Sequence, residues 1–371
     1  MMLSPFRDFS LINKRIDSIL IFFICFGLLC SGLGIDKVFL FGFILFSLFF
    51  KYNQIQFDIR KAIFISLVIS YIFMISVFNG SFKPIVFYPF FGLIFIEAFQ
   101  STRDNIRVFK KMLFIYILIS LFFGIASYFF GGNIFVTTLA EKGLPFIKPI
   151  LGLTTTVQTF GTLCVLWLLI NFESEDKKIS YKFFLVAFAL LMTFNRISYI
   201  LFFVVLSLYS RFFLLSFFLS FIIIYILFFE LINSFIFNAS TLTSRSELLQ
   251  GFYISFWNDN SFLGYLFGKA DNFYSPDVMR LVKWDHRADI ENIYAMLLHT
   301  YGFLGLFFYL ALCSSFVLNL AISGYVKFSL ITLFYLFFTQ FFTQEFVTNN
   351  FYLYIAVILS LITYKNESSN N

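Results

Sequence analysis

Long apolar runs separated by short polar segments make up most of the chain. A membrane-spanning helix needs about 20 predominantly apolar residues, or somewhat fewer where it is tilted and anchored at the interface. The pattern predicts twelve spans, at 16–33, 38–50, 62–79, 84–99, 112–130, 153–171, 182–194, 197–210, 212–232, 302–322, 328–345 and 350–364. The seventh and eighth runs could form one broken hairpin, so ten to twelve spans fit the pattern. We therefore expect an all-α polytopic membrane protein with a single transmembrane domain over 1–371.

Basic residues predict which ends of these spans face the cytoplasm. With the N-terminus inside, sixteen lysines and arginines fall in cytoplasmic segments. The short segments on the opposite side hold five, namely Lys37, Lys83, Lys142, Lys148 and Arg196. Because short cytoplasmic loops are enriched in Lys and Arg, both termini are expected in the cytoplasm.

Two extracytoplasmic segments are longer than the other connections. The first loop covers 131–152, and the large loop covers 233–301, where polar, charged and Trp residues gather before the tenth span. A long structured loop in a compact protein is usually functional. The sequence therefore predicts an active site on the outer face, carried by 233–301.

Composition narrows the class of protein and its partners. Hydrophobic residues make up 60% and charged residues 12% of the chain, whereas soluble domains have about 45–50% and about 25%. The net charge of +6 is explained by basic residues flanking membrane spans, so nucleic acid is not an expected partner. The cysteines lie in apolar runs without CxxC spacing, which predicts small buried residues: Cys25, Cys30, Cys164 and Cys313.

The motifs for nucleotide and metal binding are missing from the sequence. It has no Gly-rich phosphate loop, and its two histidines, His286 and His299, form no zinc-ligand pattern. We interpret Asp285, Asp289 and Glu291 as solvated rather than metal-binding, so no cofactor or metal is expected. A substrate that reacts outside the cytoplasm without a nucleotide must carry its own activation. A lipid-linked diphosphate sugar would do so, and its diphosphate would need guanidinium groups at the membrane surface.

The stretch FNRIS places Arg196 at a tight outward turn between two apolar runs. An arginine at that depth is costly unless it is paired or faces a wet cavity, which favours a functional role. The alternative is an arginine that extends to the lipid headgroups.

The stretch TSRSELLQGFYISFWNDNSFLGYLFG carries a second candidate arginine. Ser244 is expected to cap a helix whose first turn holds Arg245, where the backbone dipoles also favour anions. Gly264 and Gly268 would then permit a tight turn or a close backbone approach. The alternative is the charged face of an amphipathic helix that lies on the membrane.

The stretch ENIYAMLLHTYGFLG carries a candidate carboxylate. On one continuous helix, Leu298, Gly302 and Gly305 fall on the same side as Glu291. The two glycines would let a neighbouring helix approach closely, with Glu291 at the membrane rim above that junction. The alternative is a satisfied interfacial glutamate.

These three stretches together resemble the O-antigen polymerase (Wzy-like) and O-antigen ligase superfamily of membrane glycosyltransferases. The third is similar to its HNxYLxxLxxxGxxG signature at Asn292, Tyr294, Leu298, Gly302 and Gly305, with Glu291 in the histidine position. The second resembles its SGR segment and the glycine turn that follows, at Ser244, Arg245, Leu263 and Gly264, without the glycine between serine and arginine. FNRIS resembles its SR pair, with Asn195 in place of the serine.

The resemblance implies a bacterial inner-membrane enzyme that transfers undecaprenyl-diphosphate-linked glycans on the periplasmic face. Ligases of this superfamily carry the histidine, so Glu291 favours a repeat-unit polymerase for O-antigen or capsule-type polysaccharide. A ligase and a flippase or transporter for lipid-linked oligosaccharides are the alternatives. In the expected mechanism, an acceptor hydroxyl displaces undecaprenyl diphosphate. Arg245 and Arg196 would stabilise the leaving diphosphate, and Glu291 would act as general base.

Further residues of the outer segments are expected to bind the substrate. They are Asn292, Tyr294, His286, Arg287, Lys142 and Lys148. The expected partners are the lipid-linked donor and acceptor, the bilayer, a flippase and a chain-length regulator.

Overall fold

The computed structural model of the chain describes most of the predicted spans. The residues it describes are 6–51, 59–78, 92, 103–132, 134–138, 147–173, 180–227, 229, 239–257, 261–268, 292–343 and 345–369. Over these residues the secondary structure is helical, apart from one antiparallel bridge between Val136 and Ile150. The all-α prediction is therefore confirmed.

The described residues form helices from the first part of the chain to the last. They are α1 (Phe6–Phe23), η1 (Ile24–Leu28), η2 (Ser31–Leu33), α2 (Asp36–Lys51), α3 (Ile59–Phe78), α5 (Arg103–Phe130), α6 (Val157–Glu173), α7 (Tyr181–Leu191), α8 (Arg196–Tyr209), α9 (Arg211–Leu227), α11 (Ala239–Trp257), α12 (Phe262–Phe267), α14 (Ile293–Ile322), α15 (Val326–Leu333), η6 (Phe334–Phe338), η7 (Thr339–Phe341), η8 (Glu345–Val347) and α16 (Asn349–Ser369). Of these, η1 and η6 are π-helices, and η2, η7 and η8 are 3₁₀-helices.

Most predicted apolar runs coincide with a helix, but the helix boundaries differ. α5 begins at Arg103 rather than at 112, and α14 begins at Ile293 rather than at 302. The first turns of α5 are polar, so an apolar run does not include them. α14 begins with apolar residues and kinks at Gly302, where the predicted run begins. The run at 84–99 lies almost entirely outside the described residues.

Two helices of the described part of the chain are long and apolar enough to cross a bilayer by length and composition. They are Asn105–Phe130 within α5 and Ile293–Ile322. Five other apolar helical segments are 10–17 residues long. The number of twelve spans therefore stays a prediction.

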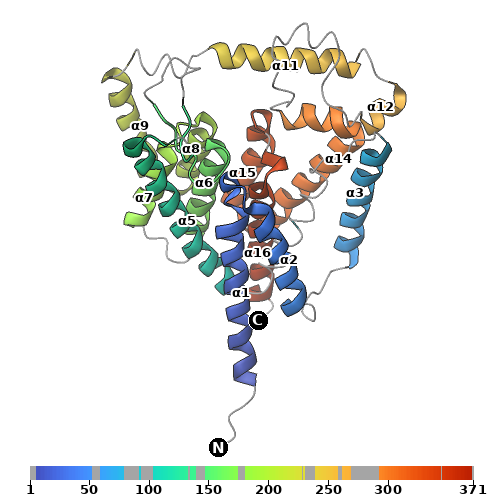
Figure 1. Cartoon of the computed structure of the whole chain (residues 1–371), viewed down its shortest axis with the longest axis horizontal. Coiled ribbons are helices and arrows are strands. Elements are labelled where there is room, and N and C mark those ends of the chain that lie inside the picture. Colours follow the sequence, from blue (N-terminus) through green and yellow to red (C-terminus); the bar gives the residue numbers. More distant parts are fainter. Residues whose placement is uncertain are drawn as a thin grey trace, which may run out of the picture.

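The helices form an upright bundle with two distinct ends (Figure 1). α1 begins and α16 ends at one of them, which we call the terminal end, and α11 lies across the opposite one, which we call the α11 end. A hydrogen bond shows where α6 starts. The backbone N–H of Gly32, which follows α1 and η1, donates to the carbonyl of Leu153, which precedes α6 (N···O 3.0 Å). The start of α6 is therefore on the side away from the terminal end. Its last residue, Glu173, therefore points toward the terminal end.

α6 is buried along nearly its whole length. Every side chain from Thr159 to Phe172 is buried. Trp167 is 1% exposed, and its indole N–H donates to the carbonyl of Lys110 at 2.9 Å. The four cysteines are also buried and free, as expected for small apolar residues.

A close backbone contact joins α12 to α14 at two glycines. Gly268 has φ 79° and Gly302 has φ 66°, a region that disfavours other residues. A Cβ on Gly302 would lie 2.4 Å from the carbonyl carbon of Leu266, and one on Gly268 would lie 2.4 Å from that of Thr300. The close approach predicted from these glycines is confirmed.

The expectation that the stretch ENIYAMLLHTYGFLG forms one continuous helix is wrong. α14 kinks at Gly302, whose ψ of −167° is not helical. The turn allows the end of α12 to pack against the α14 backbone. Leu298 and Gly305 lie on opposite sides of the kink, so they share no unbroken helical face.

Candidate functional site

A buried carboxylate near the start of α6 is the centre of a polar network. Glu345 is 3% exposed and begins η8. Its Oε1 accepts hydrogen bonds from Gln158 Nε2 at 3.3 Å and from Thr162 Oγ1 at 2.5 Å. Its Oε2 accepts one from the hydroxyl of Tyr335. We call these four residues the Glu345 network; it joins α6 to η6 and η8.

The π-helix η6 provides acceptors beside this network. A π-helical turn is wider than an α-turn and alters the backbone pairing, so carbonyls can accept from side chains. The hydroxyl of Tyr309 donates to the carbonyl of Leu336 at 2.7 Å, and that of Tyr294 donates to Phe337 at 2.6 Å. The wide turn is therefore tied to both parts of α14, before and after its kink.

More polar side chains are buried close by along the chain. Asn350 donates from Nδ2 to the carbonyl of Thr159 at 3.0 Å. Gln340 is 0% exposed and Thr343 is 2% exposed. Within the described residues, Gln340 Oε1 and Thr343 Oγ1 have no hydrogen-bond partner. Buried polar groups are normally paired, so this region is a candidate site of function.

Arg196 is the first residue of α8, directly after the turn that follows α7. Asn195 caps the helix, since its Oδ1 accepts from the backbone N–H of Ser198 at 3.0 Å. The first turn of α8 packs tightly on α6, because a Cβ on Gly161 would lie 2.2 Å from Ser198 Oγ. Gly161 immediately precedes the threonine that donates to Glu345. The predicted turn and the network are thus neighbours.

Lys148 belongs to a segment that pairs with the same turn. The backbone N–H of Ile150 donates to the carbonyl of Met192 at 2.9 Å. Lys148 itself is half-buried, and its backbone carbonyl accepts from the hydroxyl of Tyr128. The structure therefore brings the segments of two predicted site residues, Lys148 and Arg196, together.

Asn292 and Tyr294 hold the start of α14 in place. Asn292 is the N-cap, and its Oδ1 accepts from the backbone N–H of Ala295 at 3.1 Å. The ring of Tyr294 lies 4.5 Å from that of Phe341, measured between centroids. These contacts give both residues a structural role, and their binding of substrate stays a prediction.

The expected cap at Ser244 is wrong. α11 begins at Ala239, so Arg245 lies inside the helix rather than in its first turn. No Gly or Pro occurs between Ala239 and Ser244, so no strong helix breaker stops the helix from extending back past Ser244. α11 is joined to α14 through Ser255, whose Oγ lies 3.4 Å from His299 Nε2.

The remaining predicted site residues lie outside the described part of the chain. They are Glu291, His286, Arg287 and Lys142. Glu291 directly precedes the N-cap of α14, so its position along the chain is next to a described helix start.

The Glu345 network was not predicted from the sequence, in which Glu345 ends the apolar run 328–345. A usable signal was the polar content around it, with Thr339, Gln340 and Thr343 before it and Asn350 after it.

Comparisons with protein-family models, with curated proteins and with solved structures gave no match for this chain.

Proposed function

We propose that the chain is a polytopic membrane glycosyltransferase. It joins undecaprenyl-diphosphate-linked oligosaccharide repeat units on the periplasmic face of a bacterial inner membrane. Its reactive end is the α11 end, and about twelve helices cross the bilayer.

The distribution of side chains supports a lipid environment. Large apolar side chains point outward along α9, where Phe212 is 74% exposed, Ile223 58% and Ile226 69%. Polar side chains such as Gln340 and Thr162 are buried inside the bundle. Apolar surface of this extent is a liability in water and is suited to lipid.

One observation carries the proposal of a site at the α11 end. The start of α8 and the start of α14 are connected through the Glu345 network and the π-helix beside it. Arg196 opens α8, and Glu291 directly precedes the cap of α14. The helix that begins with Arg196 and the helix that follows Glu291 in the chain are therefore connected through one network.

The chemistry is a single displacement at the anomeric carbon of the growing chain. A hydroxyl oxygen of the incoming unit forms the new bond, and the bond to the diphosphate oxygen breaks with its electron pair. Glu291 accepts the hydroxyl proton. Arg196 and Arg245 stabilise the charge that develops on the leaving diphosphate.

A transporter for lipid-linked oligosaccharides is the second candidate, and a specific observation favours it. An ionisable residue buried within a membrane domain often marks a transport pathway. Glu345 is such a residue in this proposal, with Gln340 and Thr343 buried near it in the chain.

The substitution Glu291→Gln separates the candidates in a bacterial host that depends on this protein for surface glycan. General-base assistance is worth about a hundred- to ten-thousand-fold in rate, so a polymerase should leave only single repeats on the final acceptor. Long lipid-linked chains without surface glycan would identify a ligase. Single lipid-linked units held in the cytoplasmic leaflet would identify a transporter. Unchanged long surface chains would contradict the catalytic role of Glu291.

A further inference from the structure

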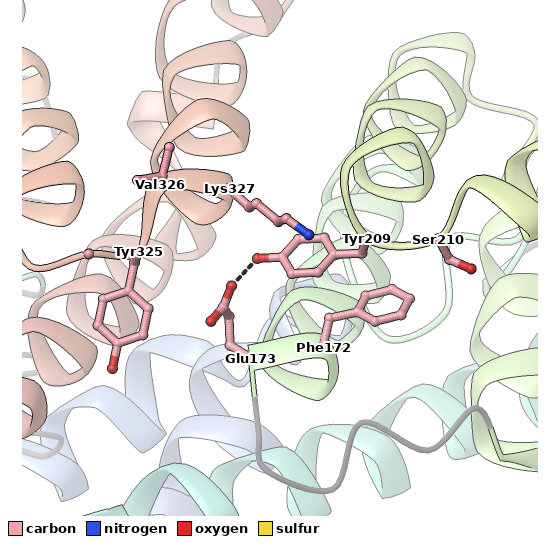
Figure 2. A pocket seen from close by; sticks show the side chains of 8 residues that line it. Phe172, Glu173, Tyr209, Ser210, Tyr325, Val326 and Lys327 are labelled. Carbon is pink, nitrogen blue, oxygen red and sulfur yellow. Dashed lines mark hydrogen bonds between the residues drawn. The ribbon is translucent and has the colours of Figure 1, made fainter.

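A cavity of about 460 Å³ lies at the terminal end of α6, far along this helix from the Glu345 network (Figure 2). It opens between the last residues of α6 and α8 and the first residues of α15. Part of its wall is aromatic: the rings of Phe172 and Tyr209 are stacked, with centroids 5.0 Å apart and an interplanar angle of 11°.

Two opposite charges share this cavity with one tyrosine between them (Figure 2). The carboxylate of Glu173 accepts a hydrogen bond from the hydroxyl of Tyr209. The ammonium nitrogen of Lys327 lies 5.4 Å from the centroid of the same ring. In the described part of the chain, both charges contact Tyr209 rather than each other. The cavity thus offers an anionic and a cationic group to one ligand.

Exposed apolar surface runs from the cavity along two helices. On α15, Val326 is 57% exposed, Leu330 49% and Leu333 46%. On α9, which begins directly after the cavity residue Ser210, Phe212 is 74% exposed. A ligand with a charged head and apolar tails would match both features, whereas a small soluble zwitterion would use only the cavity.

We propose that this cavity binds the headgroup of phosphatidylethanolamine. Lys327 contacts the lipid phosphate, and Glu173 accepts hydrogen bonds from the primary ammonium group. The acyl chains follow the apolar side chains of α15. The inference rests on the proposed embedding in a membrane, and it is independent of glycosyl transfer.

The two charges select this lipid class over the other common headgroups. Phosphatidylglycerol has no cation to pair with Glu173. Phosphatidylcholine carries a quaternary ammonium with no N–H to donate to the carboxylate. Charge-assisted hydrogen bonds are stronger than neutral ones, so losing one should reduce affinity measurably.

Native mass spectrometry of the purified, delipidated full-length protein tests this proposal. Phosphatidylethanolamine, phosphatidylglycerol and phosphatidylcholine with identical acyl chains are titrated in separate samples. We expect one tightly bound phosphatidylethanolamine, held about tenfold more tightly than either of the others, since tenfold corresponds to the loss of about one strong contact. Equal binding of the three lipids would overturn the proposal.

Variants assign the effect to the cavity. Glu173→Gln should remove the preference over phosphatidylglycerol, and Lys327→Gln should weaken binding of both phospholipids. Lys37→Gln, which removes an exposed lysine at the start of α2, should change neither. An unchanged preference in Glu173→Gln, or unchanged affinities in Lys327→Gln, would contradict the assignment. If Glu173→Gln fails to fold, the affinities of Lys327→Gln decide, because that side chain is exposed.

Further measurements distinguish a failure of the lipid site from a failure of the proposed glycosyl transfer or of the proposed membrane embedding. Soluble phosphoethanolamine that competes as well as the lipid would show that the tails contribute nothing, which contradicts a lipid site. Polysaccharide synthesis is measured on the wild-type protein in parallel. Absence of synthesis together with a preference for phosphatidylethanolamine would contradict the proposed function and leave the lipid site standing. Extraction of the protein without detergent would contradict the membrane embedding.

Discussion

The two ends of α6 place a glutamate and a tyrosine in opposite settings. Near its first turns, Glu345 is 3% exposed and accepts from three neutral donors on two other elements. At its last residue, Glu173 is half-buried, has one tyrosine donor, and faces an open cavity with Lys327. A hydrogen bond between a tyrosine and a glutamate is therefore enclosed in the bundle at one end of α6 and lines an open cavity at the other.

Burial explains why the two carboxylates should differ in energetic importance. A buried donor that loses its acceptor costs about 1–3 kcal/mol, because water does not replace the lost bond. An exposed charged group contributes only about 0–1 kcal/mol. Substitutions at the Glu345 network should therefore destabilise the fold, and the same substitutions at the cavity should leave it nearly intact.

The largest effect is expected for Glu345→Ala. The change leaves the donors of Gln158, Thr162 and Tyr335 without their acceptor, which should lower the free energy of unfolding by about 3–5 kcal/mol. Thermal unfolding of the purified protein in detergent measures it. Glu173→Ala is the matched control, with an expected change within about 1 kcal/mol. Equal losses in the two variants would remove the distinction between the two ends.

A smaller loss is expected where α12 meets the kink of α14. Gly302→Ala forces a side chain into a positive φ and to within 2.4 Å of the Leu266 carbonyl carbon, which should destabilise by about 2–3 kcal/mol. Gly34 also has a positive φ, 69°, but its Cβ would meet nothing within 4 Å. Gly34→Ala should therefore cost only the backbone strain, about 1 kcal/mol. A Gly302→Ala protein as stable as Gly34→Ala would contradict the close contact.

The smallest effects are expected for two Tyr→Phe substitutions, each of which removes one hydroxyl at one end of α6. Tyr335→Phe leaves Glu345 one donor short and should cost about 1–2 kcal/mol. Tyr209→Phe keeps its stacking on Phe172 and should cost less than about 0.5 kcal/mol, since the partly exposed Glu173 can bind water. The two melting temperatures are compared in one detergent. A larger loss for Tyr209→Phe would reverse the account of the two ends.

The sequence predicted the helices better than it predicted their polar contacts. Apolar runs show where helices form because burial or lipid contact of one element is a local property of its residues. The predicted spans 112–130 and 302–322 lie within α5 and α14, which begin earlier: α5 has polar first turns, and α14 kinks at Gly302, where the predicted span begins. The Ser244 cap was wrong for a related reason, since a capping residue does not by itself start a helix.

The Glu345 network could not be predicted in the same way. Thr162 is 183 residues away from its partner Glu345 along the chain. Such a pairing depends on how helices pack. The polar residues around Glu345 mark the region in the sequence, but they do not identify its partners on other helices. Gly268 and Gly302 are the intermediate case: their lack of a side chain predicted a close approach, but only the fold identifies each as the other's neighbour.

The central claim is that the α11 end joins lipid-linked repeat units, and reconstitution tests it most directly. The purified full-length protein is placed in liposomes with repeat units extracted from host membranes that lack it, and product lengths are resolved on a gel. The account predicts a ladder of lengthening chains for the wild-type protein. It predicts a loss of about 10²–10³ in rate for Arg196→Lys, because lysine cannot make the planar two-point contact with a diphosphate. Units that cross the bilayer without being joined, or a ladder unchanged by Arg196→Lys, would contradict it.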